Sequence, residues 1–345
     1  MNKRIISKTI LFSLIMGSIL SCGKDDDSVT NPTETTNVYI AGYEQNSNIN
    51  QAKFWKNGTV TSLPTTGKPS IGQAVFVSGK DVFIVGQEAM SSATDANRQI
   101  KLWKNGVLAK TITDGTKDAV ANDLYVAGND VYITGIEFNG TNNVAKVWKN
   151  GTPTNLTDGT KEGVANAISV SGGNVYVAGS EFDGMNNVLK LWKNGVAQNL
   201  NSGAKSAEAY AVFVNNNDVY VAGEEQGTAK FWKNGIATII AGNSAIAKGI
   251  YVSGNDVYVI FEQYNAETKK WQGKLWKNAQ ISNISNGTQN CSLTGISVDA
   301  NDIYVIGSES NGTVDVAKIW KNGTATNLTN STQKATALDI AVVKQ

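Results

Sequence analysis

The chain has no histidine among its 345 residues. It therefore lacks the side chain that most often acts as a general base near neutral pH, and Ser-His-Asp and Cys-His catalytic arrangements are excluded. The commonest metal ligand is missing for the same reason. Any chemistry must come from carboxylates, lysine, tyrosine or hydroxyl groups, and no catalytic constellation of these is recognisable in the sequence.

Arginine is almost as scarce, since it occurs only at Arg4 and Arg98. The 30 basic and 29 acidic residues leave a net charge of +1, so there is no basic surface of the kind that binds nucleic acid. No dinucleotide-binding glycine fingerprint is present either. We therefore expect no nucleic-acid partner, no cofactor and no metal.

Long hydrophobic runs are absent apart from one near the N-terminus. Residues 10–20 are largely apolar and follow the basic residues Lys3, Arg4 and Lys8. The run is shorter than the roughly 20 apolar residues that a transmembrane helix needs. This arrangement predicts a signal peptide over residues 1–21.

The run ends in Ile19-Leu20-Ser21-Cys22, which resembles the lipobox of bacterial lipoproteins. Residues 23–27 (GKDDD) resemble the acidic signal that follows the lipidated cysteine in surface-exposed lipoproteins of Bacteroidetes. The resemblance implies an acylated (palmitate-bearing) Cys22, stable attachment to the outer membrane and a position facing the cell exterior. A plain secretory peptide, with an incidental Cys22 and a charged spacer, is the alternative.

Cysteine is limited to Cys22 and Cys291. With Cys22 acylated, Cys291 is the remaining thiol of the mature chain, so no intramolecular disulfide can form. Residues 22–37 are polar, lack apolar periodicity and are expected to form a flexible tether after the lipidated cysteine.

What the chain does contain is a repeat. The tetrapeptide Trp-Lys-Asn-Gly occurs six times, and a seventh copy ends in Ala279. Successive tryptophans are 48, 45, 44, 40, 44 and 44 residues apart, a period typical of propeller blades or stacked sheet units. The seven structural tryptophans are Trp55, Trp103, Trp148, Trp192, Trp232, Trp276 and Trp320.

Each repeat carries four short strand signals. In the third, residues 122–127, 131–134, 145–148 and the segment after Gly151 are separated by turn sequences such as Asn129-Asp130 and Asn150-Gly151. Asn-Gly favours a type I′ turn between antiparallel strands. The sequence therefore predicts an all-β fold, a seven-bladed β-propeller of four-stranded antiparallel blades over residues 38–345. An open β-solenoid is the alternative.

The two ends of the repeat region complement each other. Residues 38–42 match the second strand of the other units and have no strand before them, whereas residues 337–343 match the missing first strand. We therefore expect one blade to combine strands from both ends of the chain, which closes the ring and covers the open sheet edges. A solenoid gives no reason for complementary ends. We expect a monomer.

Several residue types recur in every unit. The tryptophans and an aromatic residue of the second strand are expected to pack between blades. A lectin with one sugar stacked on each tryptophan is the alternative. A glutamate and a lysine flank one hairpin in each unit and are expected to pair across the strands; a carboxylate ring around a cation is the alternative. The pairs are Glu44–Lys53, Glu88–Lys101, Glu137–Lys146, Glu181–Lys190, Glu225–Lys230, Glu262–Lys274 and Glu309–Lys318.

The two ends of the blades differ. The Asn-Gly turns and the turns between first and second strands are short and uniform, whereas the loops at the opposite end vary in length and content. Binding function usually lies in variable loops on a rigid scaffold. The candidate binding residues are those at the starts of the innermost strands (Gln73, Asn122, Asp123, Asn166, Tyr210, Lys248, Thr294, Leu338 and Asp339) and three rim anchors (Arg98, Tyr264 and Trp271).

The texture of residues 165–179 resembles that of secreted bacterial repeat propellers. The resemblance covers residues 37–345 and implies a fold but no activity, because propellers host unrelated functions. Sialidase-type Asp boxes, WD signatures and a recurring kelch double glycine are absent. We expect a surface-tethered binding or scaffold protein for a glycan, peptide or protein partner. The alternative is an extracellular glycan hydrolase or lyase on the same scaffold.

Overall fold

The computed structural model describes residues 34–93, 96–242 and 244–345. Residues 35–345 form one unit that consists of 28 strands joined by turns and loops. The predicted signal peptide, Cys22 and most of the predicted tether lie outside the described residues. Among the described residues, none belongs to a helix that is long and apolar enough to cross a membrane.

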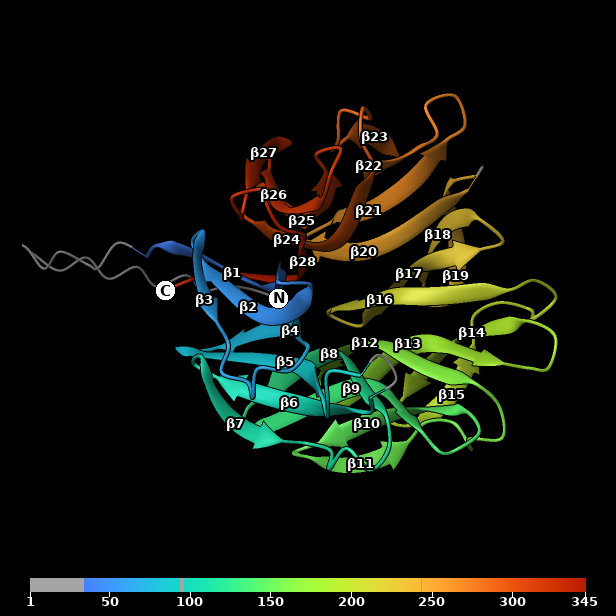
Figure 1. The fold of residues 1–345 in the computed structure, drawn as a ribbon. Coiled ribbons are helices and arrows are strands. Elements are labelled where there is room, and N and C mark those ends of the chain that lie inside the picture. The colour runs from blue at the N-terminus through green and yellow to red at the C-terminus, as the bar shows by residue number, and fades with distance from the viewer. Residues whose placement is uncertain (1–33, 94–95, 243) are drawn as a thin grey trace, which may run out of the picture. The chain divides into compact units, whose positions relative to one another are not determined.

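The strands form seven antiparallel four-stranded sheets, here called blades 1 to 7, arranged around a ring (Figure 1). Blade 1 contains β28 (Ala335–Lys344), β1 (Thr36–Asn46), β2 (Ile49–Lys56) and β3 (Thr59–Ser62). Blades 2 to 4 contain β4 (Ser70–Ser78), β5 (Asp81–Ala89), β6 (Arg98–Lys104) and β7 (Val107–Thr111); β8 (Ala119–Ala127), β9 (Asp130–Phe138), β10 (Asn143–Lys149) and β11 (Thr152–Asn155); and β12 (Gly163–Ser171), β13 (Asn174–Phe182), β14 (Asn187–Lys193) and β15 (Val196–Asn199). Blades 5 to 7 contain β16 (Ala207–Asn215), β17 (Asp218–Glu225), β18 (Thr228–Lys233) and β19 (Ile236–Ala241); β20 (Ala245–Ser253), β21 (Asp256–Asn265), β22 (Lys270–Lys277) and β23 (Gln280–Asn283); and β24 (Cys291–Asp299), β25 (Asp302–Ser310), β26 (Asp315–Lys321) and β27 (Thr324–Asn327). The predicted seven-bladed propeller is confirmed.

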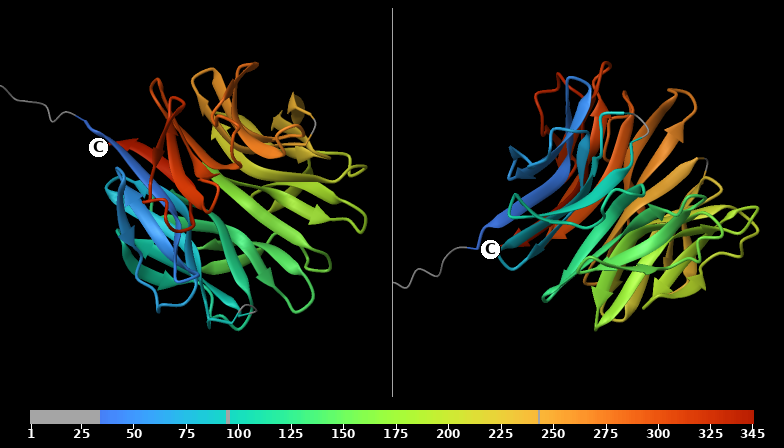
Figure 2. Two further views of the ribbon diagram at one scale, coloured as in Figure 1. Left: turned by 45° about the horizontal axis from the view of Figure 1, so that its top comes forward. Right: turned by 60° about the horizontal axis from the view of Figure 1, so that its bottom comes forward.

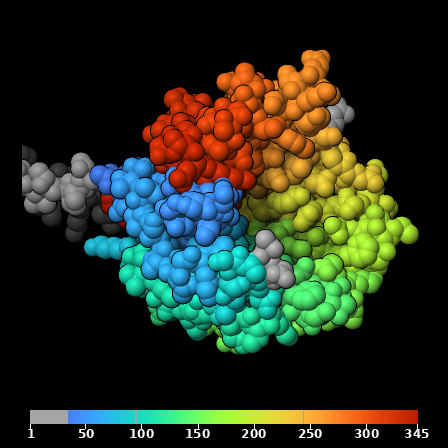
Figure 3. Space-filling view, in the orientation of Figure 1, coloured from blue at the N-terminus to red at the C-terminus, as the bar shows by residue number. Residues whose placement is uncertain are grey.

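The ring closes through blade 1, as predicted. Strand β1 lies between β2 and the C-terminal strand β28, and β28 also contacts β4 of blade 2 and β24 of blade 7. Beyond the sheet, Thr35 and Gln345 exchange two backbone hydrogen bonds of 2.9 and 3.1 Å. Figures 2 and 3 show the first and last coloured segments of the unit side by side. The two ends of the propeller are therefore held in one sheet.

The tetrapeptide combines a turn with an inter-blade contact. Each Asn and the residue after it have positive φ, for example 53° at Asn150 and 90° at Gly151, as a type I′ turn requires. Six of the tryptophans are at most 2% exposed, and Trp276 is partly buried. The indole of Trp192, for example, donates to the backbone oxygen of Leu156 in the preceding blade. These side chains are packed between blades, which leaves no exposed indole face at these six positions for a sugar to stack on.

The lysine and asparagine of the tetrapeptide have roles that the repeat pattern did not reveal. In blade 3, Lys149 lies over the ring of Tyr132, 5.2 Å from its centroid, and pairs with Asp130 at 2.7 Å. The Asn150 side chain accepts from the Val131 amide and donates to the same Asp130. Similar contacts recur around the ring, so Trp-Lys-Asn-Gly ties each outer hairpin to the start of the second strand of its own blade.

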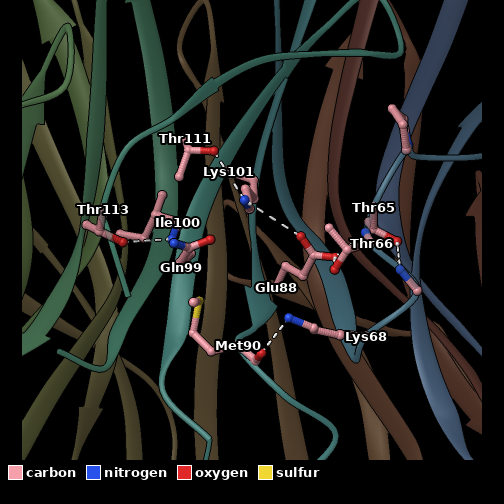
Figure 4. Close-up of polar contacts among 12 residues, drawn as sticks. Thr65, Thr66, Lys68, Glu88, Met90, Gln99, Ile100, Lys101, Thr111 and Thr113 are labelled. Carbon is pink, nitrogen blue, oxygen red and sulfur yellow. Dashed lines mark hydrogen bonds and ion pairs between the residues drawn. The ribbon is translucent and has the colours of Figure 1, made fainter. Parts of the chain in front are cut away.

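Six of the seven predicted Glu–Lys pairs are present. Glu88 and Lys101, for example, are 3.7 Å apart, and the carboxylate also accepts from the Thr66 hydroxyl (Figure 4). The predicted Glu262–Lys274 pair is wrong. Phe261 pairs with Lys274 where the other blades have glycine, so the residue equivalent to the paired glutamates is Gln263, whose side chain accepts from Lys274 at 2.9 Å. Glu262 lies on the opposite side of the strand, with consequences for the candidate site.

Candidate functional site

The innermost strands surround a cavity of about 390 Å³ at the end of the channel nearest the variable loops. We call it the channel-mouth cavity. All seven innermost strands contribute the side chain of a bulged residue to its lining: Gln73, Asn122, Asn166, Tyr210, Lys248, Thr294 and Leu338. These are the seven equivalent positions that the sequence comparison singled out. Asp123 and Asp339, which follow two of the bulges, line the same cavity.

The bulge explains why these positions point into the channel. In each blade the register between first and second strands shifts by one residue, as between Ala165 and Ala167 in blade 4, so that Asn166 has no partner opposite it. A bulged residue interrupts the alternation of side chains and redirects its own. In six of the seven blades the second strand has a glycine beside the bulge, because a side chain would meet backbone there: a Cβ on Gly179 would lie 1.9 Å from the Val164 backbone oxygen. Blade 6 has Phe261 at this position. The backbone bulge thus recurs in all seven blades, whereas the residue type at the bulge differs from blade to blade.

Three of the bulged residues connect adjacent blades. The Asn122 side chain donates to the Ala165 backbone oxygen at 3.0 Å, Asn166 to the equivalent oxygen of the next blade at 2.8 Å, and Thr294 to that of blade 1 at 2.8 Å. Each accepting carbonyl belongs to the residue immediately before the bulge of the next blade. These residues line the cavity, but their hydrogen-bonding groups are already partly used within the ring.

Blades 5 and 6 break this pattern. Lys248 lies over the ring of Tyr210, 4.3 Å from its centroid, and is the one cation among the residues that line the channel-mouth cavity. The Tyr210 hydroxyl is 3.3 Å from Glu208, to which it donates. Burial, with the negative charges of Glu208 and Glu224, raises the pKa of Tyr210 well above its usual value. Tyr210 is therefore a hydrogen-bond donor at neutral pH and is unsuited to act as a base.

The two aspartates are partly buried acids that line the same cavity. Asp123 accepts from the backbone amides of Leu124 and Ile168, and Asp339 from those of Val75 and Ile340, all at 2.7–2.8 Å. Burial raises the pKa of Asp339 to about 6. Burial, together with the charge of Asp339, raises the pKa of Asp123 well above its usual range. Each carboxyl group also joins its blade to the next blade of the ring.

Arg98 does not project freely from the rim. Its guanidinium forms two hydrogen bonds with Asp118, of 2.8 and 2.5 Å, and its backbone amide donates to the same carboxylate. These contacts fasten the start of β6 in blade 2 to the segment before β8 in blade 3. The structure thus gives Arg98 an intramolecular partner that sequence comparison could not identify, because Asp118 lies 20 residues away in the next repeat.

We expect Arg98→Ala to destabilise the fold. The substitution leaves the half-buried Asp118 carboxylate without its bidentate partner, and such charge-assisted contacts contribute roughly 1–3 kcal/mol. Urea unfolding of the wild type and the variant measures the difference. Lys117→Ala is the matched control, since it removes one exposed cation next to Asp118. Equal unfolding midpoints for wild type and Arg98→Ala would contradict the assigned role.

Tyr264 and Trp271, the other two predicted rim anchors, form a single feature. They are opposite each other in the β21–β22 hairpin, with ring centroids 5.5 Å apart. Tyr264 is 38% exposed and Trp271 is partly buried. Trp271 also lines a second cavity, of about 300 Å³, together with Glu262, Asn290 and Ser292. The structure therefore brings these two anchors together and places them away from Arg98, which belongs to blade 2.

Sequence reasoning missed the acidic surroundings of Lys248. Glu208 and Glu224 lie in blade 5 and contribute to the potential at Tyr210, as does Glu262 in blade 6. Their repeat positions are occupied by apolar or neutral residues in most other blades, such as Val164 and Ser180 in blade 4. A position-by-position comparison of charge, rather than of recurring residues, could have found them.

Two further features bear on possible chemistry. Among the described residues, no group of three or more Cys, Asp or Glu side chains is placed to hold a metal ion. Cys291 is 2% exposed, and burial raises the pKa of its thiol to about 12. Because the thiolate is the reactive form, Cys291 is a poor nucleophile at neutral pH.

The chain matches no protein-family model and no curated protein sequence. Among solved structures, it is similar to a Trypanosoma rangeli sialidase in complex with sialic acid, with a TM-score of 0.48 and 12% identity over 87% of this chain and 56% of the sialidase chain. The same sialidase with the inhibitor DANA gives 0.48 and 13% over 81% and 56%. YjhT gives 0.44 and 14% over 77% of this chain and 99% of that chain. The chain thus spans little more than half of the sialidases, and similarity at this level carries no information about activity.

Proposed function

We propose that this protein is a lipid-anchored surface receptor or scaffold that binds a glycan, peptide or protein partner at the channel mouth. The observation that carries the proposal is the cavity of about 390 Å³ lined by the seven bulged residues. Pockets that bind small ligands have volumes of roughly 300–1,000 Å³ and a few converging polar groups. The bulge position is the place where the blade plan fixes the backbone and leaves the side chain open to selection for a ligand.

Tyr210 and Lys248 are the residues most suited to ligand contact. At three of the other bulges the side chain already donates a hydrogen bond to the backbone of the neighbouring blade, as Asn166 does to Ala209. The Lys248 ammonium instead offers donors beside the cavity, and the oxygen of the Tyr210 hydroxyl, whose hydrogen is donated to Glu208, offers an acceptor together with the surrounding carboxylates. This mixture suits a polar ligand, which is held by directional hydrogen bonds at one side of the channel.

The anchor and location belong to the same proposal. Acylation of Cys22 would hold the propeller at the outer membrane, facing the exterior. The tether would be shorter than the predicted residues 22–37, because Thr36 and Asn37 belong to β1. A monomer with one binding face toward the medium is the arrangement that this implies.

A hydrolase is the second candidate, and the pair Asp123 and Asp339 favours it. Two partly buried carboxyl groups with raised pKa values in one cavity are a feature of sites that use acid and base catalysis. Against this, both oxygens of each carboxyl group already accept a backbone amide. These hydrogen bonds give the carboxyl groups a structural role in joining adjacent blades. The binding function is therefore the stronger proposal.

The test uses the soluble form, residues 23–345, on glycan and peptide arrays, with the bound sugars also assayed for cleavage. We expect binding without turnover. Lys248→Met retains the aliphatic stem over Tyr210 but removes the charge, so it should weaken binding about tenfold or more without a change in melting temperature. Lys117→Ala, which removes an exposed lysine outside the cavity, is the control. Unchanged binding by Lys248→Met would rule out the channel mouth, and turnover lost in Asp123→Asn would favour the hydrolase.

A further inference from the structure

A second, smaller cavity opens between blades 6 and 7 on the variable-loop face. It has a volume of about 300 Å³ and is lined by Trp271, Glu262, Asn290, Ser292, Ser308 and Asp315, with Cys291 at its base. Ser292 also lines the channel-mouth cavity, so the two hollows meet at this residue. We call the smaller one the blade 6–7 pocket.

Trp271 contributes an aromatic ring to the pocket, and Tyr264, which is not part of the lining, packs against it. Trp271 and Tyr264 lie opposite each other in the hairpin, and hydrogen bonding of the Trp271 amide to the Asn290 side chain, at 3.0 Å, fixes the start of β22. The residue at the Trp271 position is Asn143 in blade 3, Asn187 in blade 4 and Asp315 in blade 7. Among the seven blades, only blade 6 places an aromatic ring there. The blade plan therefore does not require Trp271.

The rest of the lining is rich in hydrogen-bond acceptors. Glu262 is opposite Gly273 in the β21–β22 hairpin, so it lies on the same face of blade 6 as Trp271, whereas Ser292, Ser308 and Asp315 come from blade 7. Glu262 is 7% exposed, and its Oε1 accepts from the Ser292 hydroxyl at 2.9 Å and from the Leu293 amide at 2.7 Å. Among the described residues, no donor is paired with the second carboxylate oxygen, Oε2. Glu262 therefore presents an accessible acceptor oxygen at the pocket wall. Glu262 comes one residue before the position of the paired glutamates in the other blades. Its side chain therefore points to the pocket and not toward Lys274.

The charges around the pocket are close to balanced. Asp315 pairs with Lys334 at 3.6 Å, and the positive charge of Lys248 acts on Glu262. Each carboxylate therefore already has a cationic neighbour, which weakens the attraction of the pocket for a cationic ligand, and two carboxylates beside one pocket disfavour an anionic ligand. The pocket thus suits a neutral molecule with one apolar face and several hydroxyl donors.

We propose that the blade 6–7 pocket binds a neutral pyranose residue of a glycan, whose ring stacks on Trp271 and whose hydroxyl groups donate to Glu262 and the serines. This inference rests on the proposed binding function and names the class of ligand. The volume is at the lower end of the range for ligand pockets, which fits one sugar ring. Because Ser292 joins the two cavities, the next residue of the chain would extend toward Tyr210 and Lys248.

The experiment measures calorimetric affinity for a panel of neutral oligosaccharides (cello-, xylo-, manno- and chito-oligosaccharides) and for oligogalacturonates as the acidic comparison. The proteins are the wild type, Trp271→Ala, Tyr264→Ala and Phe138→Ala, all in the soluble form. Phe138 is the matched control, because it occupies the Tyr264 position in blade 3 and is also 38% exposed. Melting temperatures are recorded for every variant, to separate binding from folding.

We expect at least one neutral oligosaccharide to bind, with about tenfold loss of affinity in Trp271→Ala, a smaller loss in Tyr264→Ala and none in Phe138→Ala. Glu262→Gln should also weaken binding, which provides a second test if Trp271→Ala melts early. Absence of neutral oligosaccharide binding by the wild type overturns the inference, as does equal affinity in Trp271→Ala. Binding of oligogalacturonate that depends on Lys248 but not on Trp271 also overturns it and leaves the proposed channel-mouth function standing.

Discussion

Removal of residues 336–345 is expected to collapse the thermal stability of the propeller. The deletion takes away almost all of β28, the innermost strand of blade 1, together with the buried side chains of Ala337 and Ile340. Strand β1 would lose one of its two neighbours, and blades 2 and 7 would lose their contacts with β28. Because each blade is stabilised mainly by its neighbours, opening the ring exposes two blade faces and a sheet edge at once.

The measurement is calorimetric unfolding of the truncated and full-length soluble forms, and we expect a lower, broader transition or aggregation before one is reached. The control is a circular permutant in which residues 333–345 precede Thr35 through an Asn-Gly turn. Thr35 and Gln345 already exchange backbone hydrogen bonds, so a tight hairpin can join them. The permutant should melt close to the wild type. A truncated protein with the melting temperature of the full-length protein would show that the ring does not depend on this closure.

The architecture was predictable because a repeat gives seven independent readings of one structural unit. Trp-Lys-Asn-Gly marked the end of the third strand and its turn in each blade, and the complementary segments at residues 38–42 and 337–343 predicted closure. The same alignment identified the seven bulged residues as equivalent, although the bulge itself cannot be read from alternation of apolar residues. Strong periodicity therefore predicted both the fold and the positions that face the channel.

What the repeat could not predict lies in contacts between blades. Arg98 pairs with Asp118, and Asn122 with the carbonyl of Ala165, because the ring brings successive repeats together. A comparison of equivalent positions shows which residues recur, but not which residues of adjacent blades contact each other. The Glu262 assignment failed for a different reason. In the other blades the paired glutamate comes two residues after a glycine, but blade 6 has Phe261 in place of that glycine. Glu262 comes only one residue later, so its side chain lies on the opposite face of the strand from the paired glutamates.

The candidate site is therefore asymmetric because the bulged residues differ in type, although the backbone of the seven blades is nearly the same. Asn122, Asn166 and Thr294 at three bulges, and the aspartates that follow two bulges, join one blade to the next, whereas the bulged residues of blades 5 and 6, Tyr210 and Lys248, do not. Lys248, Tyr210 and Trp271 all lie in these two blades, and Ser292 connects their two cavities. The proposed ligand path follows from this division between side chains that hold the ring and side chains that the ring does not need.

The second large effect is expected from Gly179→Ala, which tests whether the second-strand glycine supports the bulge. The added Cβ would lie 1.9 Å from the Val164 backbone oxygen and 3.2 Å from the Cα of Ala165, both in the innermost strand. No rotamer can relieve a clash with backbone, so β12 must move. We expect a loss of about 3 kcal/mol in the free energy of unfolding, measured by urea titration, which corresponds to a shift on the order of 5 °C.

Gly242→Ala is the matched control for Gly179→Ala, since a Cβ there meets nothing within 4 Å, and it should stay within about 0.5 kcal/mol of the wild type. Blade 6 accommodates Phe261 at the glycine position, next to its own bulge at Lys248. Blade 4 is packed around glycine, so its backbone must shift to admit the Cβ of Gly179→Ala. Movement of β12 would also displace the neighbouring Asn166, so ligand binding at the channel mouth should weaken even at temperatures where the variant remains folded. An unfolding midpoint equal to that of Gly242→Ala would mean that the backbone at the bulge moves at little cost. The proposal that a rigid backbone positions the channel-mouth residues would then be wrong.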